Sequence, residues 1–127
     1  RANGQYVFSS PIPGFGASLM IFSPSGMTME DYYGAPADPA LYKNFKLSME
    51  KLMPAGILPQ FYRDFESGRI GYLSTNGASA QLSGAITGLE IALIITGKRK
   101  KEDLVVVPDI IYLDLFNRNY SIFNPCK

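Results

Sequence analysis

The chain contains no histidine and no tryptophan, and its 127 residues include a single cysteine, Cys126. Without histidine it lacks the commonest general base, the commonest transition-metal ligand and the usual pH-sensitive side chain. One cysteine can form neither an internal disulfide nor a cysteine-based zinc site. These absences argue against serine–histidine catalysis and most metal centres, so the sequence predicts neither a metal nor a cofactor.

An excess of charge of one sign is also lacking. The 12 basic and 11 acidic residues give a net charge of +1. Such a balance creates no overall field that attracts nucleic acid or an anionic membrane, so we predict no nucleic-acid partner. From the sequence, no apolar run is judged to reach the roughly 18 to 20 residues that span a bilayer, and we therefore predict no membrane span.

What the chain does contain is typical of one globular domain covering residues 1–127. Its apolar fraction is 46% and its charged fraction 18%, which favours a packed core over disorder. The first residue is arginine, so the chain has been processed, trimmed or cut from something longer. Loss of a signal peptide is one explanation, and a secreted or periplasmic location is favoured over a cytoplasmic one. Homo-oligomer formation is left open.

Short apolar segments bounded by glycine and proline predict about six strands, mostly antiparallel. Asn76-Gly77 is a strong hairpin-turn signal, because both residues tolerate positive φ. Leu89 to Thr96 alternates like a half-buried strand, and the G-x-x-x-G of residues 84–88 is interpreted as a bulge or a close strand approach. The predicted strands cover residues 5–9, 17–22, 69–74, 78–83 and 89–96, followed by a run over 104–107 and 109–116 in which Pro108 marks a bulge or an edge position. Residues 120–123 are a candidate for a last short strand.

One principal helix is predicted over residues 39–53. Asp38 is a good N-cap, Pro39 suits the first helical position, and Leu41 and Phe45 begin an apolar stripe. A short second helix is expected over residues 59–66. The predicted fold is therefore α+β, an antiparallel sheet with the helices packed on one face.

Two catalytic patterns were weighed. Ser48 and Lys51 have the S-x-x-K spacing of serine acyl-enzymes, but Ser48 falls in mid-helix and no companion motif follows, so chance is the better explanation. A carboxylate pair could hydrolyse glycosides, yet no spacing singles out a pair. Asp109 and Asp114 have opposite strand parity and should not share a face. The acids are interpreted as ordinary surface residues.

Two groups of residues are candidates for binding a partner. Met29, Tyr32 and Tyr33 lie in an irregular segment over residues 27–37, where they either cover the core or form a contact surface. The only basic cluster is expected at a solvated hairpin tip or, if functional, against an acidic protein surface. Its members are Lys98, Arg99, Lys100 and Lys101.

These observations favour a non-enzymatic protein-binding module, of the kind found as accessory, inhibitor or immunity-type domains of secreted or envelope systems. One alternative is a hydrolase that uses carboxylates alone, which needs two acids about 5 to 10 Å apart in a cleft. The other is a carrier of a small apolar ligand, which needs a pocket lined by phenylalanine and tyrosine.

Overall fold

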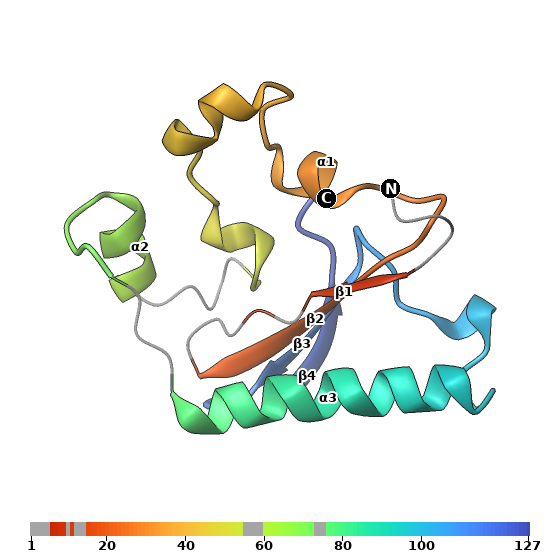
Figure 1. Ribbon diagram of the computed structural model, residues 1–127. Helices are drawn as coiled ribbons and strands as arrows, with labels where there is room; N and C mark the ends of the chain where they lie inside the picture. The colour runs from red at the N-terminus through yellow and green to blue at the C-terminus, as the bar shows by residue number, and fades with distance from the viewer. Residues whose placement is uncertain (1–5, 10, 12–14, 55–59, 73–75) are drawn as a thin grey trace.

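The fold is α+β and is built on one antiparallel sheet (Figure 1). The computed structural model describes residues 6–9, 11, 15–54, 60–72 and 76–127. Within these residues the sheet has four strands in the order β1-β2-β3-β4. The strands are β1 (Val7–Ser9), β2 (Gly16–Phe22), β3 (Ile110–Asp114) and β4 (Asn119–Phe123).

The strand prediction is right at the two ends of the chain and wrong in the middle. The four observed strands match the expected segments near residues 5–9, 17–22, 109–116 and 120–123. The expected strand over 104–107 does not form, and Val107 instead donates its N–H to the Ile21 carbonyl beyond the central ladder. Residues 69–72 form turns and bends, whereas residues 73–75 lie outside the described part.

The largest correction concerns residues 77–95, which form one helix, α3 (Gly77–Ile95), instead of two strands. Asn76 caps this helix, because its side-chain Oδ1 accepts the Ser79 N–H at 2.8 Å. The dipeptide that predicted a hairpin turn therefore begins a helix. Gly84 and Gly88 lie in mid-helix and not at a strand bulge.

The predicted principal helix over residues 39–53 is replaced by two short 3₁₀ helices, η1 (Pro39–Asn44) and η2 (Met49–Lys51). Asp38 does cap η1, accepting the Ala40 N–H at 2.9 Å. The chain is extended at Phe45 and Ser48, so the helix does not continue. Leu41 is 50% exposed, and its stripe therefore has no surface against which a longer helix would pack.

Three further helical segments are short. The second predicted helix is found as α2 (Gln60–Glu66), and the supposedly irregular segment 27–37 contains α1 (Met29–Tyr33). The last is η4 (Lys101–Asp103), which precedes β3.

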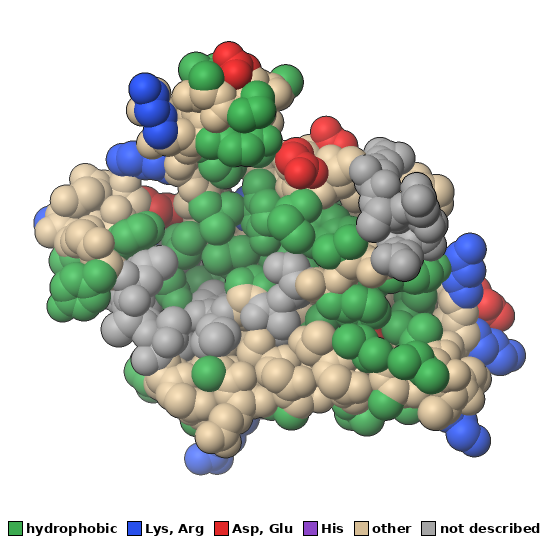
Figure 2. Space-filling view, viewed as in Figure 1, with side chains coloured by type: hydrophobic (Ala, Val, Ile, Leu, Met, Phe, Trp, Pro, Cys, Tyr) green, Lys and Arg blue, Asp and Glu red, His purple; other side chains and the backbone are tan. Residues whose placement is uncertain are grey.

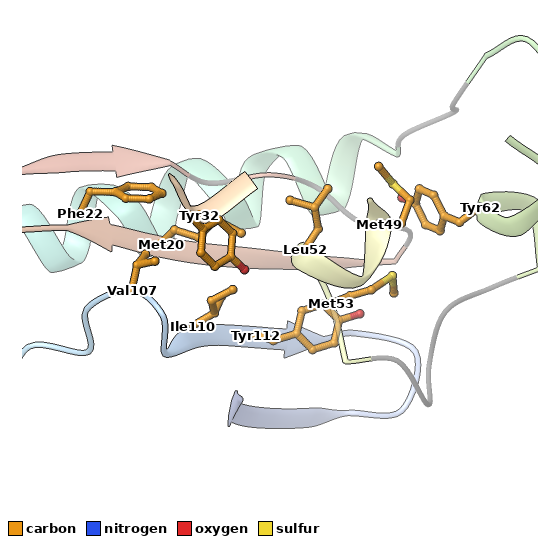
Figure 3. Packing of buried hydrophobic residues seen from close by; sticks show 10 residues of the cluster. All are labelled: Met20, Phe22, Tyr32, Met49, Leu52, Met53, Tyr62, Val107, Ile110 and Tyr112. Carbon is orange, nitrogen blue, oxygen red and sulfur yellow. The ribbon is translucent and has the colours of Figure 1, made fainter. Parts of the chain in front are cut away.

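The main core lies between the sheet and the segments that follow β2 (Figure 3). Tyr32 of α1, Met53 and Tyr62 of α2 each expose 2% or less of their surface there. Phe22 and Tyr32 meet edge to face with ring centroids 6.0 Å apart. The buried members of the cluster are Met20, Phe22, Tyr32, Met49, Leu52, Met53, Tyr62, Val107, Ile110 and Tyr112.

A smaller cluster fills the opposite side of the sheet, where α3 lies along β2 (Figure 1). Leu19, Ile21 and Ile111 are buried there, and Ile86 of α3 packs on them. By length and composition α3 could cross a membrane, and only 17% of its most apolar window is buried. A single helix that passes on length and composition alone is weak evidence of a span, so the absence of a membrane span stays a prediction.

Candidate functional site

An apolar hollow lies beside α2. Residues 37–48 project from the body and form what we call the arm, drawn in gold in Figure 1. The hollow lies between the base of the arm and α2 and has a volume of about 710 Å³. Figure 2 shows apolar side chains gathered beneath the arm on this face. The lining residues are Phe45, Lys46, Leu47, Ser48, Met49, Phe65 and Glu66.

The floor of the hollow is η2, which three other elements hold in place. Glu66 of α2 accepts the Met49 N–H through Oε1 at 2.7 Å. Tyr32 of α1 donates its hydroxyl to the Lys51 carbonyl at 2.5 Å. Ser18 of β2 donates its hydroxyl to the carbonyl of Leu52, the next residue. Met49 is itself only 3% exposed, so the floor is fixed by hydrogen bonds and by burial together.

The arm supplies the second wall. Because the chain is extended from Phe45 to Ser48, side chains alternate in direction. Phe45 and Leu47 are half-buried, whereas Lys46 and Ser48 are exposed. From α2, Phe65 is also half-buried and completes a largely apolar lining. Next to it, η1 presents Leu41 and Tyr42 to solvent at 50% and 47% exposure.

The structure places the aromatic candidates at the base of this site. Tyr32 is 1% exposed, and the Tyr33 hydroxyl donates to Met20 Sδ at 3.3 Å. Met29 is 36% exposed at the start of α1. The two tyrosines therefore cover the core, and Tyr32 also positions η2, while Met29 faces solvent.

Burial also sets the chemistry of Tyr32. Desolvation raises the pKa of its phenol, and the neighbouring Tyr33 and Cys126 add smaller effects in the same direction. Lys51 lies over its ring, with Nζ 5.3 Å from the centroid, and Nζ also lies 3.6 Å from Cys126 Sγ. Tyr32 therefore stays protonated at neutral pH and acts as a hydrogen-bond donor.

The basic candidates lie elsewhere, in the segment that leaves the C-terminal end of α3. The expectation of a hairpin tip is wrong, because no hairpin forms there. Arg99 turns back onto the helix and binds Glu90 with two hydrogen bonds, Nε to Oε1 at 2.9 Å and Nη2 to Oε2 at 3.2 Å. Lys98, Lys100 and Lys101 are exposed. The structure thus does not bring the aromatic and basic candidates together.

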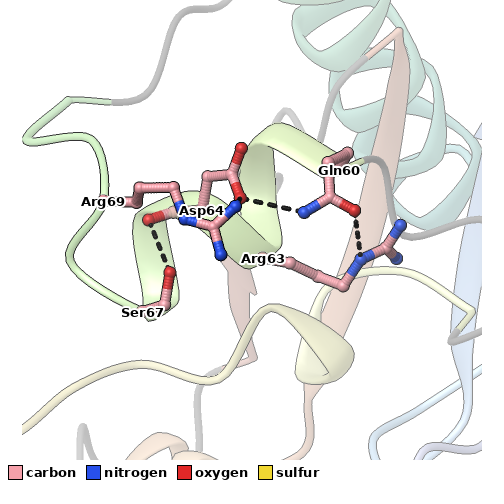
Figure 4. Close-up of polar contacts among 5 residues, drawn as sticks. All are labelled: Gln60, Arg63, Asp64, Ser67 and Arg69. Atoms are coloured by element: carbon pink, nitrogen blue, oxygen red, sulfur yellow. Dashed lines mark hydrogen bonds and ion pairs between the residues drawn. The ribbon is translucent and has the colours of Figure 1, made fainter.

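The acidic side chains that are candidates for catalysis form ion pairs, hydrogen bonds and helix caps within the fold. Asp64 of α2 pairs with Arg69 at 2.8 Å and accepts the Gln60 amide at 2.8 Å, in a network that includes Arg63 and Ser67 (Figure 4). Asp31 forms a capping box with Thr28 at the start of α1. Asp109 accepts the Asn124 amide at 2.8 Å.

Two acids are buried, contrary to the expectation of ordinary surface residues. Asp114 is 6% exposed and accepts the backbone N–H groups of Phe116 and Asn117, each at 3.0 Å. It therefore shapes the turn between β3 and β4. Glu90 is 7% exposed and pairs with Arg99 as described above.

The S-x-x-K spacing has no catalytic geometry. Ser48 is exposed and precedes the short η2, and its side chain makes no capping hydrogen bond. Lys51 is directed to the Tyr32 ring and Cys126. Among the described residues, no three or more histidine, cysteine, aspartate or glutamate side chains gather as metal ligands would.

Sequence reasoning missed the lining of the hollow. Phe45 and Leu47 were expected to be parts of a helix, and alternation over only four residues was too short a signal to indicate an extended wall. Comparisons of the chain with protein-family models, curated proteins and solved structures find no match.

Proposed function

We propose that the protein is a non-enzymatic binding module that holds another protein at the hollow between the arm and α2. The observation that carries this proposal is an apolar hollow of about 710 Å³ whose floor is fixed while its upper wall remains solvent-accessible. Energetically dominant contacts in protein complexes are side chains that fill desolvated pockets of this kind. We infer that an aromatic or aliphatic side chain of the partner enters the hollow.

The polar groups of the site favour recognition over catalysis. Glu66 already accepts the Met49 N–H, and Lys46 is exposed at the rim. Within the part of the chain that the structure describes, neither forms an ion pair, whereas a general acid or base is commonly tuned by an ionisable neighbour. The surrounding Leu41 and Tyr42 add apolar and aromatic surface, which is enriched in the centres of protein interfaces.

The same hollow is also compatible with the alternative function, a carrier of a small apolar ligand. Its volume lies within the range for small-ligand sites, and two phenylalanines line it. No tyrosine is among the lining residues. A partner side chain is favoured because the hollow is continuous with exposed apolar residues of the arm.

The experiment compares capture of a partner by the unaltered chain, by two variants of the hollow and by one control variant. Phe45→Ala and Phe65→Ala remove opposite walls of the hollow, while Phe116→Ala removes an aromatic ring that is 76% exposed at the far end of β3. Partners captured from native extract are identified by mass spectrometry, and the affinity of the purified partner is measured by biolayer interferometry.

We expect each hollow variant to weaken binding by about 30-fold, the effect of a residue that contributes ~2 kcal/mol. Phe116→Ala should change it less than threefold. Equal binding by all variants would remove the hollow from the interface. A small apolar compound retained by the purified chain in native mass spectrometry, and lost in Phe45→Ala, would favour the carrier instead.

A further inference from the structure

Burial on α3 does not follow the pattern of an ordinary surface helix. Its fully buried residues are Ser79, Ser83 and Glu90, and Ile86 packs half-buried on the sheet, whereas Leu89 and Ile95 are 61% and 79% exposed. A surface helix normally buries its apolar stripe and exposes its charges. The outward side of α3 therefore has the composition of a surface that contacts other apolar groups and not water.

This outward side also carries no charge. Glu90 is the single ionisable residue of α3, and it faces inward, with both carboxylate oxygens bonded to Arg99. The remaining exposed positions of the helix are mainly small, including Ala85, Gly88 and Ala92. A covering surface would meet an uncharged face along the length of the helix.

The neighbouring edge of the sheet continues the apolar surface. Tyr120 and Ile122 of β4 pair with Leu113 and Ile111 of β3, so they point to the side of the sheet on which α3 lies. No helix of the described residues covers them, and they are 61% and 53% exposed. Tyrosine at the border of an apolar surface is typical of residues that reach a membrane interface.

Positive charge stands at one end of this surface. The chain leaves α3 through Gly97, whose φ is 68°, and Lys98, Lys100 and Lys101 follow it, all exposed. Glu102 and Asp103 come next in η4 and reduce the net charge of this corner. The lysines are therefore expected to assist the apolar side chains in binding to an anionic surface.

We infer that the outward face of α3, with Lys98, Lys100 and Lys101 at its end, docks on an anionic lipid surface. The apolar side chains would enter the boundary between headgroups and acyl chains, and the lysines would lie among negative headgroups. The chain's balanced net charge does not oppose this, because the charges that matter lie within a Debye length of the surface. The arm lies on the side of the molecule away from α3 (Figure 1), and residues of the arm line the hollow, so one molecule can use both surfaces.

Vesicle sedimentation tests the inference. The full chain is mixed with vesicles of phosphatidylcholine alone or with one quarter phosphatidylglycerol, at 0.1 M and 0.5 M NaCl. We expect partitioning onto the anionic vesicles to exceed that onto neutral ones at least tenfold, and to fall at high salt. Leu89→Ser with Ile95→Ser should reduce it more than tenfold without changing the thermal unfolding midpoint by more than a few degrees, since both residues are exposed.

A matched pair of triple variants tests the lysines. Lys98→Gln, Lys100→Gln and Lys101→Gln together should lower partitioning by about 100-fold, at roughly fivefold for each lysine. The control replaces three exposed basic residues, Lys43, Arg63 and Lys127, by glutamine. They belong to the arm, to α2 and to the C-terminus, which Figure 1 draws apart from the C-terminal end of α3. It carries the same change of charge and should lower partitioning less than threefold.

Equal losses in the two triple variants would overturn the inference. So would a chain that ignores anionic vesicles but sediments as a dimer that Leu89→Ser with Ile95→Ser dissociates, because a second copy would then cover the face. Binding that resists alkaline carbonate extraction would indicate insertion across the bilayer and would also contradict surface docking.

Discussion

The hydroxyl of Tyr32 donates a hydrogen bond to the main-chain carbonyl of Lys51 at 2.5 Å and so joins α1 to the floor of the hollow. Tyr32 was a candidate for direct contact with a partner, but its side chain is 1% exposed. It acts on the proposed site by positioning η2. The arm is preceded by α1 and followed by η2, and both of these elements are held by the core. The arm therefore keeps its apolar residues in solvent without the support of a long helix.

Replacing Tyr32 tests this positioning role. Tyr32→Phe should lower the free energy of unfolding by about 1 kcal/mol, the typical net value of one hydrogen bond. Tyr32→Ala should lower it by about 3 to 5 kcal/mol, as for other large aromatic residues in a core. Urea unfolding followed by circular dichroism measures both. Tyr42→Ala, at a 47% exposed tyrosine, should cost less than about 0.5 kcal/mol; similar losses at both sites would contradict the burial of Tyr32.

The Glu90–Arg99 pair is expected to contribute more to stability than the Asp64–Arg69 pair. Arg99→Met leaves a carboxylate that is 9% exposed without its cation, so it should lower the free energy of unfolding more than Arg69→Met does, although less than the breaking of a fully buried pair because Arg99 is 39% exposed. Arg69→Met removes a cation that is 71% exposed from Asp64 and should cost below about 1 kcal/mol. Thermal and urea unfolding of the two variants provide the comparison, and equal costs would show that Glu90 is solvated.

Two glycine-to-alanine substitutions should change the free energy of unfolding in opposite directions. A Cβ at Gly16 would collide with the Leu113 carbonyl in the central ladder and also lie 2.8 Å from the Tyr112 hydroxyl oxygen. Gly16→Ala should therefore destabilise the protein by about 1 to 3 kcal/mol. A Cβ at Gly84 would meet no atom within 4 Å, so Gly84→Ala should stabilise α3 by about 0.5 to 1 kcal/mol. Unfolding midpoints in urea measure both, and destabilisation by Gly84→Ala would indicate that this face is already packed.

Stability should decline in alkaline solution because of two buried phenols. Burial raises the pKa of Tyr32 and of Tyr112 in the folded state, and Tyr33 and Asp114 add to the respective shifts. Below the unfolded-state pKa of about 10 both states keep the proton, so stability is unaffected there. At higher pH only the unfolded chain ionises, and the free energy of unfolding falls by up to ~1.4 kcal/mol per pH unit for each phenol.

Urea unfolding between pH 9 and pH 11 measures this slope. Tyr32→Phe should reduce it, whereas Tyr120→Phe, at a 61% exposed tyrosine, should leave it unchanged. A slope that is the same in Tyr32→Phe and the unaltered chain would rule out Tyr32 as a source of the alkaline sensitivity.

The α+β class and the four observed strands could be predicted from the sequence because their signals are local. Apolar residues in β2 and β3 are bounded by glycine, proline and polar turns, and such runs favour strands. The α2 helix was also placed correctly, apart from Pro59, which lies outside the described residues.

The middle of the chain could not be predicted because its patterns fit two structures. In α3 the apolar residues lie all around the helix, so no 3.6-residue period separates it from strands, and Asn76 suits a helix cap as well as a turn. Around Leu41 the period is helical, but the tertiary surface needed to stabilise a helix is missing. The hollow depends on contacts such as Met49 to Glu66, which join residues far apart in sequence.

The order of the strands has a consequence for how the chain assembles. β1–β2 and β3–β4 are local hairpins, but the ladder between β2 and β3 joins Gly16–Leu19 to Ile111–Asp114 across the whole of residues 23–109. Closing so long a loop is slow, so the hairpins should form before the central ladder. A single cut between β2 and β3 would leave each hairpin whole and turn their pairing into the concentration-dependent meeting of two fragments.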